Sequence, residues 1–294
     1  MASKIKAWIE AMRLRTLPVS VAGVVMAGGC AAYYHGFNLA PFLICLFFAV
    51  GAQIVSNFAN EYFDFCNGLD RKGREGFRRG VTEGDITPHA MRAATVGLLA
   101  VVCLTGLSLV CWGGWWLILV GIAVALFALA YSAGPYPLSH HGLGEIAVII
   151  FFGVVPVLFT TYVQTQSWAM LPVAMPLSLA IGFMGANVLI VNNYRDCADD
   201  AVVGKKTLAV RWGRKAVANL YLINGFVALL CIEIATALRI GFMWQIGPLI
   251  YINLHYLAWQ RMRRSEGAEL NPILGRTAML MLGLALWLTV ALAA

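Results

Sequence analysis

Charged side chains are scarce in this chain. Only 12% of its 294 residues are Asp, Glu, Lys or Arg, whereas 61% are hydrophobic. Soluble domains carry about 25% charged residues, so this composition excludes an ordinary water-soluble domain. We expect a chain that is solvated largely by lipid.

The sequence also lacks any ordered arrangement of cysteines. Its seven cysteines are scattered, and they form no Cys-x-x-Cys pair and no Cys/His spacing typical of a metal site. A zinc site or a disulfide framework is therefore not indicated. We interpret the cysteines as small apolar side chains of membrane helices.

Long, unbroken apolar runs dominate what is present. A membrane-spanning helix needs about 20 mainly apolar residues, and the runs do not alternate as the strands of a membrane β-barrel do. The sequence therefore predicts an all-α membrane protein, with about nine transmembrane helices in a single domain over residues 1–294. The expected spans are 17–35, 39–59, 93–112, 114–132, 145–163, 168–191, 216–238, 241–259 and 273–293.

The basic residues fit this order of spans. If the N-terminus lies in the cytoplasm, nine spans place every Lys and Arg except Arg239 on the cytoplasmic side, as the positive-inside rule describes. The sequence thus predicts a multi-pass protein of the cell membrane, inner or plasma, with a cytoplasmic N-terminus. Topology signals and anionic lipids account for the net charge of +7, so no nucleic-acid partner is expected.

Acidic residues gather in two segments, near 60–90 and 192–215, which the spans place in the cytoplasm. Both segments begin with Asn-x-x-x-Asp and continue to a further Asp. Residues four apart lie on one helix face, so the two faces together would gather several carboxylates that repel one another. Mg²⁺ prefers oxygen ligands and shares them with substrate phosphates. The segments therefore predict a pair of Mg²⁺ ions.

Basic residues accompany both acidic patterns. Arg74, Arg78 and Arg79 follow the first, whereas Arg195 lies inside the second and Lys205 follows it. Guanidinium groups suit bidentate contacts with phosphate, and an ammonium supplies a compact charge. Acidic residues that could bind a metal thus lie beside basic residues that could bind phosphate, at a membrane surface. This combination indicates a lipid diphosphate as the substrate. For any single cation, a topology signal or a lipid contact stays open as the alternative.

Four segments match a known family in order. They are residues 13–18, 60–84, 131–145 and 192–208. On these motifs the chain resembles the UbiA superfamily of membrane prenyltransferases over nearly its whole length. Two positions depart from the family: Glu61 stands where Asp is frequent, and Phe77 stands where Pro is frequent. Neither is a core aspartate, so both bear on substrate detail rather than on reaction class.

The spacing inside the motifs separates branches of this family. Asp64 and Asp70 enclose five residues, whereas the branch that uses 4-hydroxybenzoate usually has a tighter gap. This gap and the paired Asn192 and Asn193 resemble the branch that prenylates 1,4-dihydroxy-2-naphthoate. The resemblance implies nine helices around a central cavity, closed on the cytoplasmic side by the acidic segments.

The resemblance also implies an activity and its partners. A polyprenyl group would pass from polyprenyl diphosphate to 1,4-dihydroxy-2-naphthoate in a Mg²⁺-dependent reaction that yields demethylmenaquinone, CO₂ and diphosphate. The partners would be these two substrates and the lipid bilayer. Buried apolar surface, worth about 0.8 kcal/mol per CH₂, would hold the prenyl tail.

Site residues follow from the same resemblance. The residues expected to hold two Mg²⁺ ions bridging the diphosphate are Asn60, Asp64, Asp70, Asn192, Asp196 and Asp200. The residues expected to bind substrate are Arg74, Arg79, Arg195, Lys205 and Asn193. The four aspartates and Tyr131 are expected to be catalytic, with the Tyr131 ring facing the allylic carbocation. His140 and His141 are expected to be loop residues without a role.

Three alternatives are weighed on the sequence alone. The first is another enzyme of this family with a 4-hydroxybenzoate, homogentisate or geranylgeranylglyceryl-phosphate acceptor. The second is a membrane transporter, although transporters place functional acids near the membrane midplane and here the acids crowd one face. The third is a non-catalytic protein that binds isoprenoids, against which the intact acidic set argues.

Overall fold

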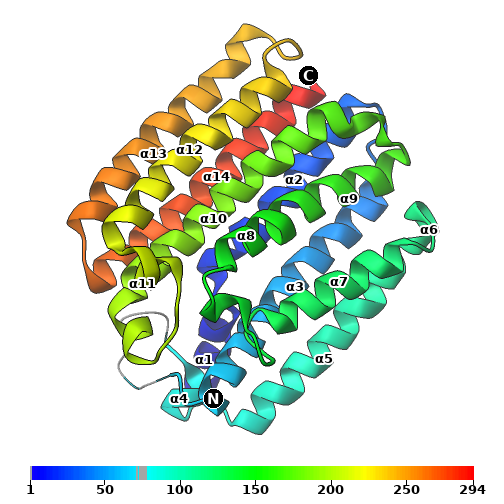
Figure 1. Cartoon of the computed structure of the whole chain (residues 1–294). Helices are drawn as coiled ribbons and strands as arrows, with labels where there is room; N and C mark the ends of the chain where they lie inside the picture. The colour runs from blue at the N-terminus through cyan, green and yellow to red at the C-terminus, as the bar shows by residue number, and fades with distance from the viewer. Residues whose placement is uncertain (1, 71, 73–77) are drawn as a thin grey trace.

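In the part of the chain that the structure describes, nine long helices make up most of the fold (Figure 1). The computed structural model describes residues 2–70, 72 and 78–294. In chain order the long helices are α2 (Leu17–Tyr33), α3 (Leu39–Cys66), α5 (Pro88–Leu107), α7 (Leu117–Ala130), α8 (Gly144–Val148) with α9 (Val155–Thr165), α10 (Leu171–Val202), α12 (Arg214–Thr236), α13 (Ile246–Arg264) and α14 (Leu270–Ala293). A π-helical stretch, Ile149–Val154, joins α8 to α9.

Short helices lie between or before the long ones. They are α1 (Ala2–Met12), α4 (Gly80–Glu83), α6 (Val110–Gly113) and α11 (Leu208–Trp212). At the start of two long helices, α3 and α5, the side chain of the preceding residue accepts a backbone hydrogen bond. Asn38 accepts a hydrogen bond from the Ala40 N–H at 3.1 Å, and Thr87 accepts one from Ala90 at 3.2 Å, as N-cap residues do.

Each of the nine predicted spans corresponds to one long helix. Among the described residues, seven helices are long and apolar enough to cross a membrane by length and composition, and α7 is a shorter apolar helix. The ninth, α13, carries three arginines in its last turn. The clearest difference concerns the acidic segments, because α3 and α10 continue through Asp64 and Asp200. The first acidic pattern and the whole of the second thus lie on helices rather than in loops.

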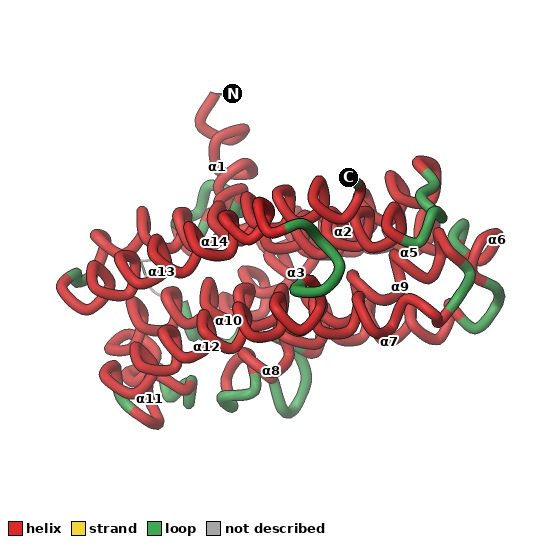
Figure 2. The backbone as a smooth tube through the Cα atoms, turned by 90° about the horizontal axis from the view of Figure 1, so that it is seen from above, coloured by secondary structure: helices red, strands yellow, loops and turns green. Residues whose placement is uncertain are grey.

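Figure 2 shows the long helices in two layers, with α13, α14, α2 and α5 in one and α12, α10, α9 and α7 in the other. Within the second layer, two helices lie close together where glycines face each other. A Cβ added to Gly153 would lie 2.5 Å from the Cα of Gly182, so only glycine lets the α8–α9 helix approach α10 this closely.

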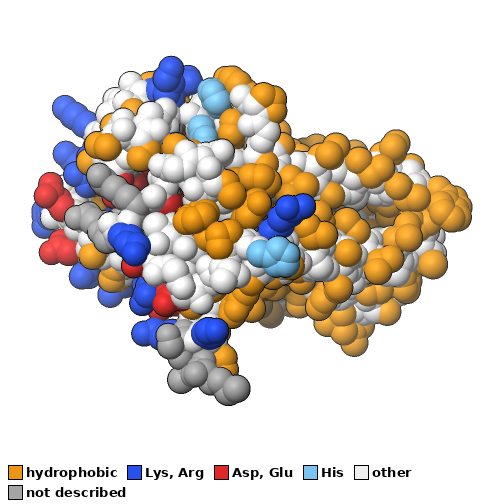
Figure 3. All heavy atoms as spheres, turned by 90° about the horizontal axis from the view of Figure 1, so that it is seen from below, with side chains coloured by type: hydrophobic (Ala, Val, Ile, Leu, Met, Phe, Trp, Pro, Cys, Tyr) orange, Lys and Arg blue, Asp and Glu red, His pale blue; other side chains and the backbone are white. Residues whose placement is uncertain are grey.

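Polar and apolar surfaces are segregated along the molecule. Lys, Arg, Asp and Glu gather at one end, near α4 and α11, and hydrophobic side chains cover most of the remaining surface in view (Figure 3). Among the exposed apolar side chains are Leu104, Leu119 and Leu238, exposed by 69%, 70% and 97%. In water this surface would be costly, whereas lipid solvates it. The fold therefore brings the ends of α3 and α10 to the charged end of a membrane protein.

Candidate active site

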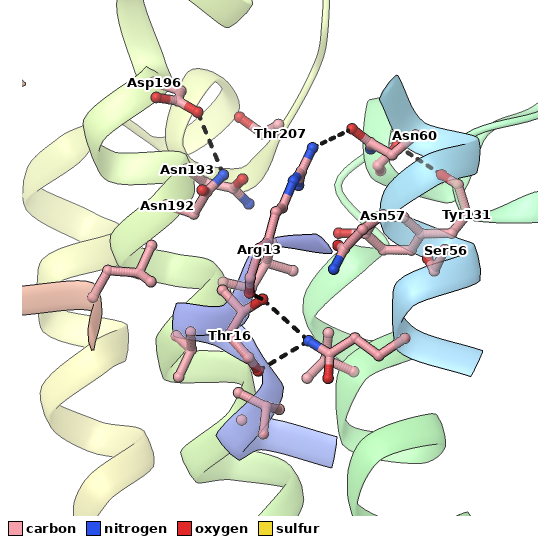
Figure 4. Close-up of a pocket in the computed structure, with 18 of the residues that line it drawn as sticks. Arg13, Thr16, Ser56, Asn57, Asn60, Tyr131, Asn192, Asn193, Asp196 and Thr207 are labelled. Atoms are coloured by element: carbon pink, nitrogen blue, oxygen red, sulfur yellow. Dashed lines mark hydrogen bonds between the residues drawn. The ribbon is translucent and has the colours of Figure 1, made fainter. Parts of the chain in front are cut away.

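The two acidic patterns line one cavity. Asn60 and Asp64 reach it from α3, and Asn192, Asp196 and Asp200 reach it from α10. Figure 4 shows the two helix ends facing each other across this space, with Arg13 between them. The i, i+4 spacing has the predicted effect, since the Asn and the Asp of each pattern point to the same side.

Asp64 is the meeting point of several chain segments. Its carboxylate is fully buried, and Lys205 Nζ lies 2.9 Å from Oδ2. Arg79 Nη2 is 3.7 Å from the same oxygen, and His140 Nε2 is 3.4 Å from Oδ1. Arg79 Nε is also 3.4 Å from Asp70 Oδ2. A buried carboxylate needs such compensation, and here it comes from residues far away in sequence.

Glu61 helps to place Arg79 beside these aspartates. The Glu61 side chain is 1% exposed, and its Oε1 accepts a hydrogen bond from the Val81 N–H at 2.9 Å. This bond fastens α4, which Arg79 directly precedes, to the side of α3. Glu61 thus serves the site through backbone placement.

Asp196 has its counter-charge next to it in sequence. Arg195 donates from Nε to Asp196 Oδ1 at 2.7 Å and from Nη2 to Oδ2 at 2.9 Å. The same guanidinium donates to Asn192 Oδ1 at 2.8 Å and to Asn271 Oδ1 at 2.7 Å. Asn271 belongs to α14, so this network also joins two helices.

The donor set of the cavity fits a hard cation. It contains carboxylate and amide oxygens and no cysteine, and Mg²⁺ prefers such oxygens while it keeps waters and substrate phosphates as further ligands. Within the described ranges, no three His, Cys, Asp or Glu side chains converge into a ready cage. Lys205, Arg79 and Arg195 instead neutralise the carboxylates. The residues therefore suit a cation that is bound together with a diphosphate.

Tyr131 follows the end of α7 and lines the same cavity. A tyrosine phenol has a pKa of about 10, so Tyr131 is neutral at physiological pH. Its neighbour Ser132 is also buried and accepts a hydrogen bond from Asn60 Nδ2 at 2.9 Å.

A second, apolar cavity continues from the first. The two cavities share Gln53, Ser56, Phe127 and Phe152 as wall residues. Beyond these residues the walls are almost entirely apolar and come from α2, α3, α7 and α9, including Val24, Phe48, Leu117, Val124, Val155 and Phe159. The polar site thus opens into a space suited to a hydrocarbon chain.

A family model with the description "UbiA prenyltransferase family" matches residues 21–282. The chain belongs to the UbiA prenyltransferase family. Among curated UbiA relatives, a 1,4-dihydroxy-2-naphthoate octaprenyltransferase of Mycobacterium tuberculosis is 36% identical over 97% of this chain and 96% of its own length. The Escherichia coli protein of the same name is 31% identical over 94% and 91% of the two chains.

Solved UbiA structures share the fold. A UbiA homolog from Archaeoglobus fulgidus bound to DMAPP and Mg²⁺ matches with a TM-score of 0.68 and 14% identity, over 97% of this chain and 98% of its own. A digeranylgeranylglyceryl phosphate synthase matches with a TM-score of 0.64 and 16% identity, over 99% of both chains.

Most of the residues that the UbiA resemblance singles out line the cavity. They are Asn60, Asp64, Arg79, Tyr131, Asn192, Asn193, Arg195, Asp196, Asp200 and Lys205. Asp70 joins them through Arg79 rather than as a wall residue. Arg74 lies outside the described residues.

Other cavity residues were not predicted. Arg13 has a left-handed backbone (φ 53°) between α1 and α2, and its Nη2 donates to Asn60 Oδ1 at 3.0 Å. Gln53, Asn57 and Thr207 also line the cavity. His140, expected to have no role, lies against Asp64. Arg13 and Thr207 stood inside matched segments with no role assigned. Gln53 and Asn57 gave no signal beyond being polar residues in an apolar run.

Proposed function

We propose that this chain transfers a polyprenyl group from polyprenyl diphosphate to 1,4-dihydroxy-2-naphthoate, releasing CO₂ and diphosphate and forming demethylmenaquinone for menaquinone biosynthesis. One observation carries the proposal: two acidic patterns and their cations line a polar cavity that opens into an apolar one. The acceptor follows from the naphthoate octaprenyltransferases to which the chain is 31% and 36% identical over nearly its full length.

The polar cavity would hold the diphosphate with two Mg²⁺ ions. When bound, Mg²⁺ neutralises the charge that develops on the leaving diphosphate. Its ligands would come from Asn60, Asp64, Asp70, Asn192, Asp196 and Asp200. Lys205, Arg79 and Arg195, which pair with carboxylates here, would turn to phosphate oxygens, and Arg74 would join them. Pre-placed cations of this kind stabilise charge at little reorganisation cost.

The remaining walls would control the prenyl fragment. The neutral Tyr131 presents an electron-rich ring to an allylic cation, and an aromatic face attracts a cation. The apolar cavity would bind the tail by burial and keep water away from the cation. We further propose that the charged end of the molecule, with the N-terminus and the site, faces the cytoplasm, as its excess of basic residues favours.

The test supplies purified protein with polyprenyl diphosphate and Mg²⁺ and offers 1,4-dihydroxy-2-naphthoate and 4-hydroxybenzoate in parallel, with products followed by mass spectrometry. We expect prenylated, decarboxylated product from the naphthoate alone. Chelation of Mg²⁺, Asp64→Ala or Asp196→Ala should abolish it. Asp85→Ala is the matched control, because Asp85 pairs with Arg78 outside the cavity.

The two other outcomes separate the alternatives. Product from the benzoate alone would retain the reaction class and overturn the acceptor. No product from either acceptor, with the protein folded, would favour a different acceptor or a non-catalytic isoprenoid-binding protein.

A further inference from the structure

One wall of the cavity carries a hydrogen-bonded pair that the diphosphate chemistry does not use. Glu145, at the start of α8, is 5% exposed, and its Oε1 accepts a hydrogen bond from Asn193 Nδ2 at 3.0 Å. Among the described residues, no Lys or Arg forms an ion pair with Glu145. Its second oxygen, Oε2, is buried and accepts no hydrogen bond in that same part of the chain. Burying a carboxyl without a cation costs free energy, so we looked for what Glu145 contributes at this position.

Helix packing fixes this pair with little freedom. A Cβ added to Gly144 would lie 3.0 Å from Leu189 Cδ2 and 3.4 Å from the Tyr131 hydroxyl. The close approach of Gly153 to Gly182 holds the same two helices further along. The backbone segments that carry Glu145 and Asn193 are therefore held close together.

The partner of Asn193 determines how its amide is turned. The Asn193 amide has an NH₂ that donates and an oxygen that accepts. In the structure the NH₂ donates to Glu145 Oε1, so Oδ1 faces away from Glu145. Asn193 lines the cavity, and its Oδ1 has no hydrogen-bond partner among the described residues. This oxygen is thus available to a ligand that donates a hydrogen bond.

The available oxygen suits a neutral donor rather than a phosphate. A carbonyl oxygen next to a buried carboxyl repels an anion, so the diphosphate belongs with the cations around Asp64 and Asp196. Val148, Leu189 and Tyr131 line the same cavity and offer apolar and aromatic surface. A flat aromatic molecule with a phenolic hydroxyl combines both requirements.

We propose that Asn193 Oδ1 accepts a hydrogen bond from a phenolic hydroxyl of the aromatic acceptor, and that Glu145 is the positioning residue that keeps the amide turned this way. The inference rests on the proposed function and deepens it, because it assigns one wall of the cavity to the acceptor and one contact to its hydroxyl. It predicts that the acceptor is recognised as a hydroxyl donor.

The first experiment measures equilibrium binding in nanodiscs without prenyl diphosphate. The ligands are 1,4-dihydroxy-2-naphthoate, 1-hydroxy-2-naphthoate and 4-hydroxy-2-naphthoate. We expect Asn193→Leu to weaken binding of the dihydroxy compound about tenfold, the usual scale for one buried hydrogen bond. One of the two monohydroxy compounds should bind the variant and the parent protein equally, because it lacks the donor hydroxyl. Equal weakening for all three ligands, or for none, would overturn the proposal.

The second experiment separates positioning from folding. Glutamine at position 145 both donates and accepts, so Glu145→Gln lets the Asn193 amide turn over. We expect the KM for the acceptor to rise about threefold to fivefold, a loss smaller than that of the whole hydrogen bond, while kcat and the KM for prenyl diphosphate stay unchanged. Combining Glu145→Gln with Asn193→Asp should recover acceptor affinity relative to Asn193→Asp alone, since a donor then faces a carboxylate again.

Asn187→Ala is the control for this pair. Asn187 is a buried asparagine of the same helix that donates to the Tyr221 carbonyl and does not line the cavity. It should lower thermal stability and leave acceptor binding unchanged. If the parent protein turns over the naphthoate but Glu145→Gln shifts only the KM for prenyl diphosphate, this inference fails and the proposed function stands. If the parent protein neither binds nor turns over any of the three aromatics, both fail together.

Discussion

The two acidic patterns are alike in sequence and differ in how their charge is balanced. Asp64, on α3, is compensated by Lys205, 141 residues away, together with Arg79 and His140. Asp196, on α10, is compensated by Arg195, the next residue in the chain. The first pattern therefore ties distant segments together, whereas the second is assembled within one helix turn and anchored to α14 by Asn271.

The two patterns therefore differ in how far they combine a structural role with a chemical one. Loss of charge at Asp64 releases cations on separate elements, so structure and chemistry are coupled there. Loss of charge at Asp196 leaves Arg195 bound to Asn192 and Asn271, so chemistry is affected more than architecture. Variants around Asp64 should therefore affect stability and activity together, whereas variants at Asp196 should affect mainly activity.

The largest effect should come from removing either carboxylate charge. Asp64→Asn and Asp196→Asn should each lower kcat by about 10²–10³-fold, the scale for losing one electrostatic group that acts on a developing charge. Turnover of prenyl diphosphate at saturating Mg²⁺ measures this. Asp85→Asn is the control and should retain activity. A loss confined to one of the two variants would show that the motifs do not act on the same diphosphate.

The structural role of Asp64 should be visible in the free energy of unfolding. Lys205→Met leaves Asp64 buried with fewer cations and should lower the free energy of unfolding by about 3 kcal/mol, the lower end for breaking a buried ion pair. The exposed pair of Arg214 and Glu266, whose Glu266 side chain is 88% exposed, is the control. Glu266→Gln should change stability by less than about 0.5 kcal/mol. Equal effects on chemical unfolding would contradict the role of Asp64 as a meeting point.

The anchor of the second pattern gives an intermediate effect. Asn271→Ala removes one charge-assisted hydrogen bond from Arg195 and should lower the free energy of unfolding by about 1.5 kcal/mol. Asn253→Ala, which removes only an exposed bond to the Leu249 carbonyl, should fall within about 0.5 kcal/mol of the parent. Thermal unfolding in one detergent compares the two. If Asn271→Ala matched Asn253→Ala, the Arg195 network would be self-sufficient.

His140 should give the smallest effect. It lies 3.4 Å from Asp64 Oδ1 but shares that carboxylate with Arg79 and Lys205. His140→Phe should lower kcat/KM by only a few-fold, corresponding to about 0.5–1 kcal/mol, mainly at limiting Mg²⁺. A Mg²⁺ titration of activity measures this. A loss as large as that of Asp64→Asn would make His140 part of the reaction itself.

The sequence predicts the helices well because their signal is local. A run of about 20 apolar residues is enough to recognise a span, and the i, i+4 spacing of Asn60 and Asp64 already fixes which side chains share a face. The helix ends were predicted less accurately. The predicted span 168–191 stops where polar motif residues begin, whereas α10 continues to Val202.

Contacts between distant segments could not be predicted in the same way. Nothing near His140 in the sequence indicates Asp64, and Glu145 meets Asn193 only because glycines let α8 approach α10. Spacing rules describe neighbours on one helix, whereas these pairs depend on how helices cross. The positions of His140 and Glu145 in the site therefore depend on tertiary contacts that local spacing does not describe.

At Arg13, the backbone conformation favours glycine, whereas the contact made by the side chain requires arginine. Its left-handed conformation costs a non-glycine residue of order 1 kcal/mol, and glycine would relieve this cost. Glycine would also remove the guanidinium that reaches Asn60 across the cavity. Thermostability engineering that ranks substitutions by backbone fit alone would therefore select Arg13→Gly and lose a contact inside the cavity. At this position, the backbone conformation and the reach of the side chain favour different residues.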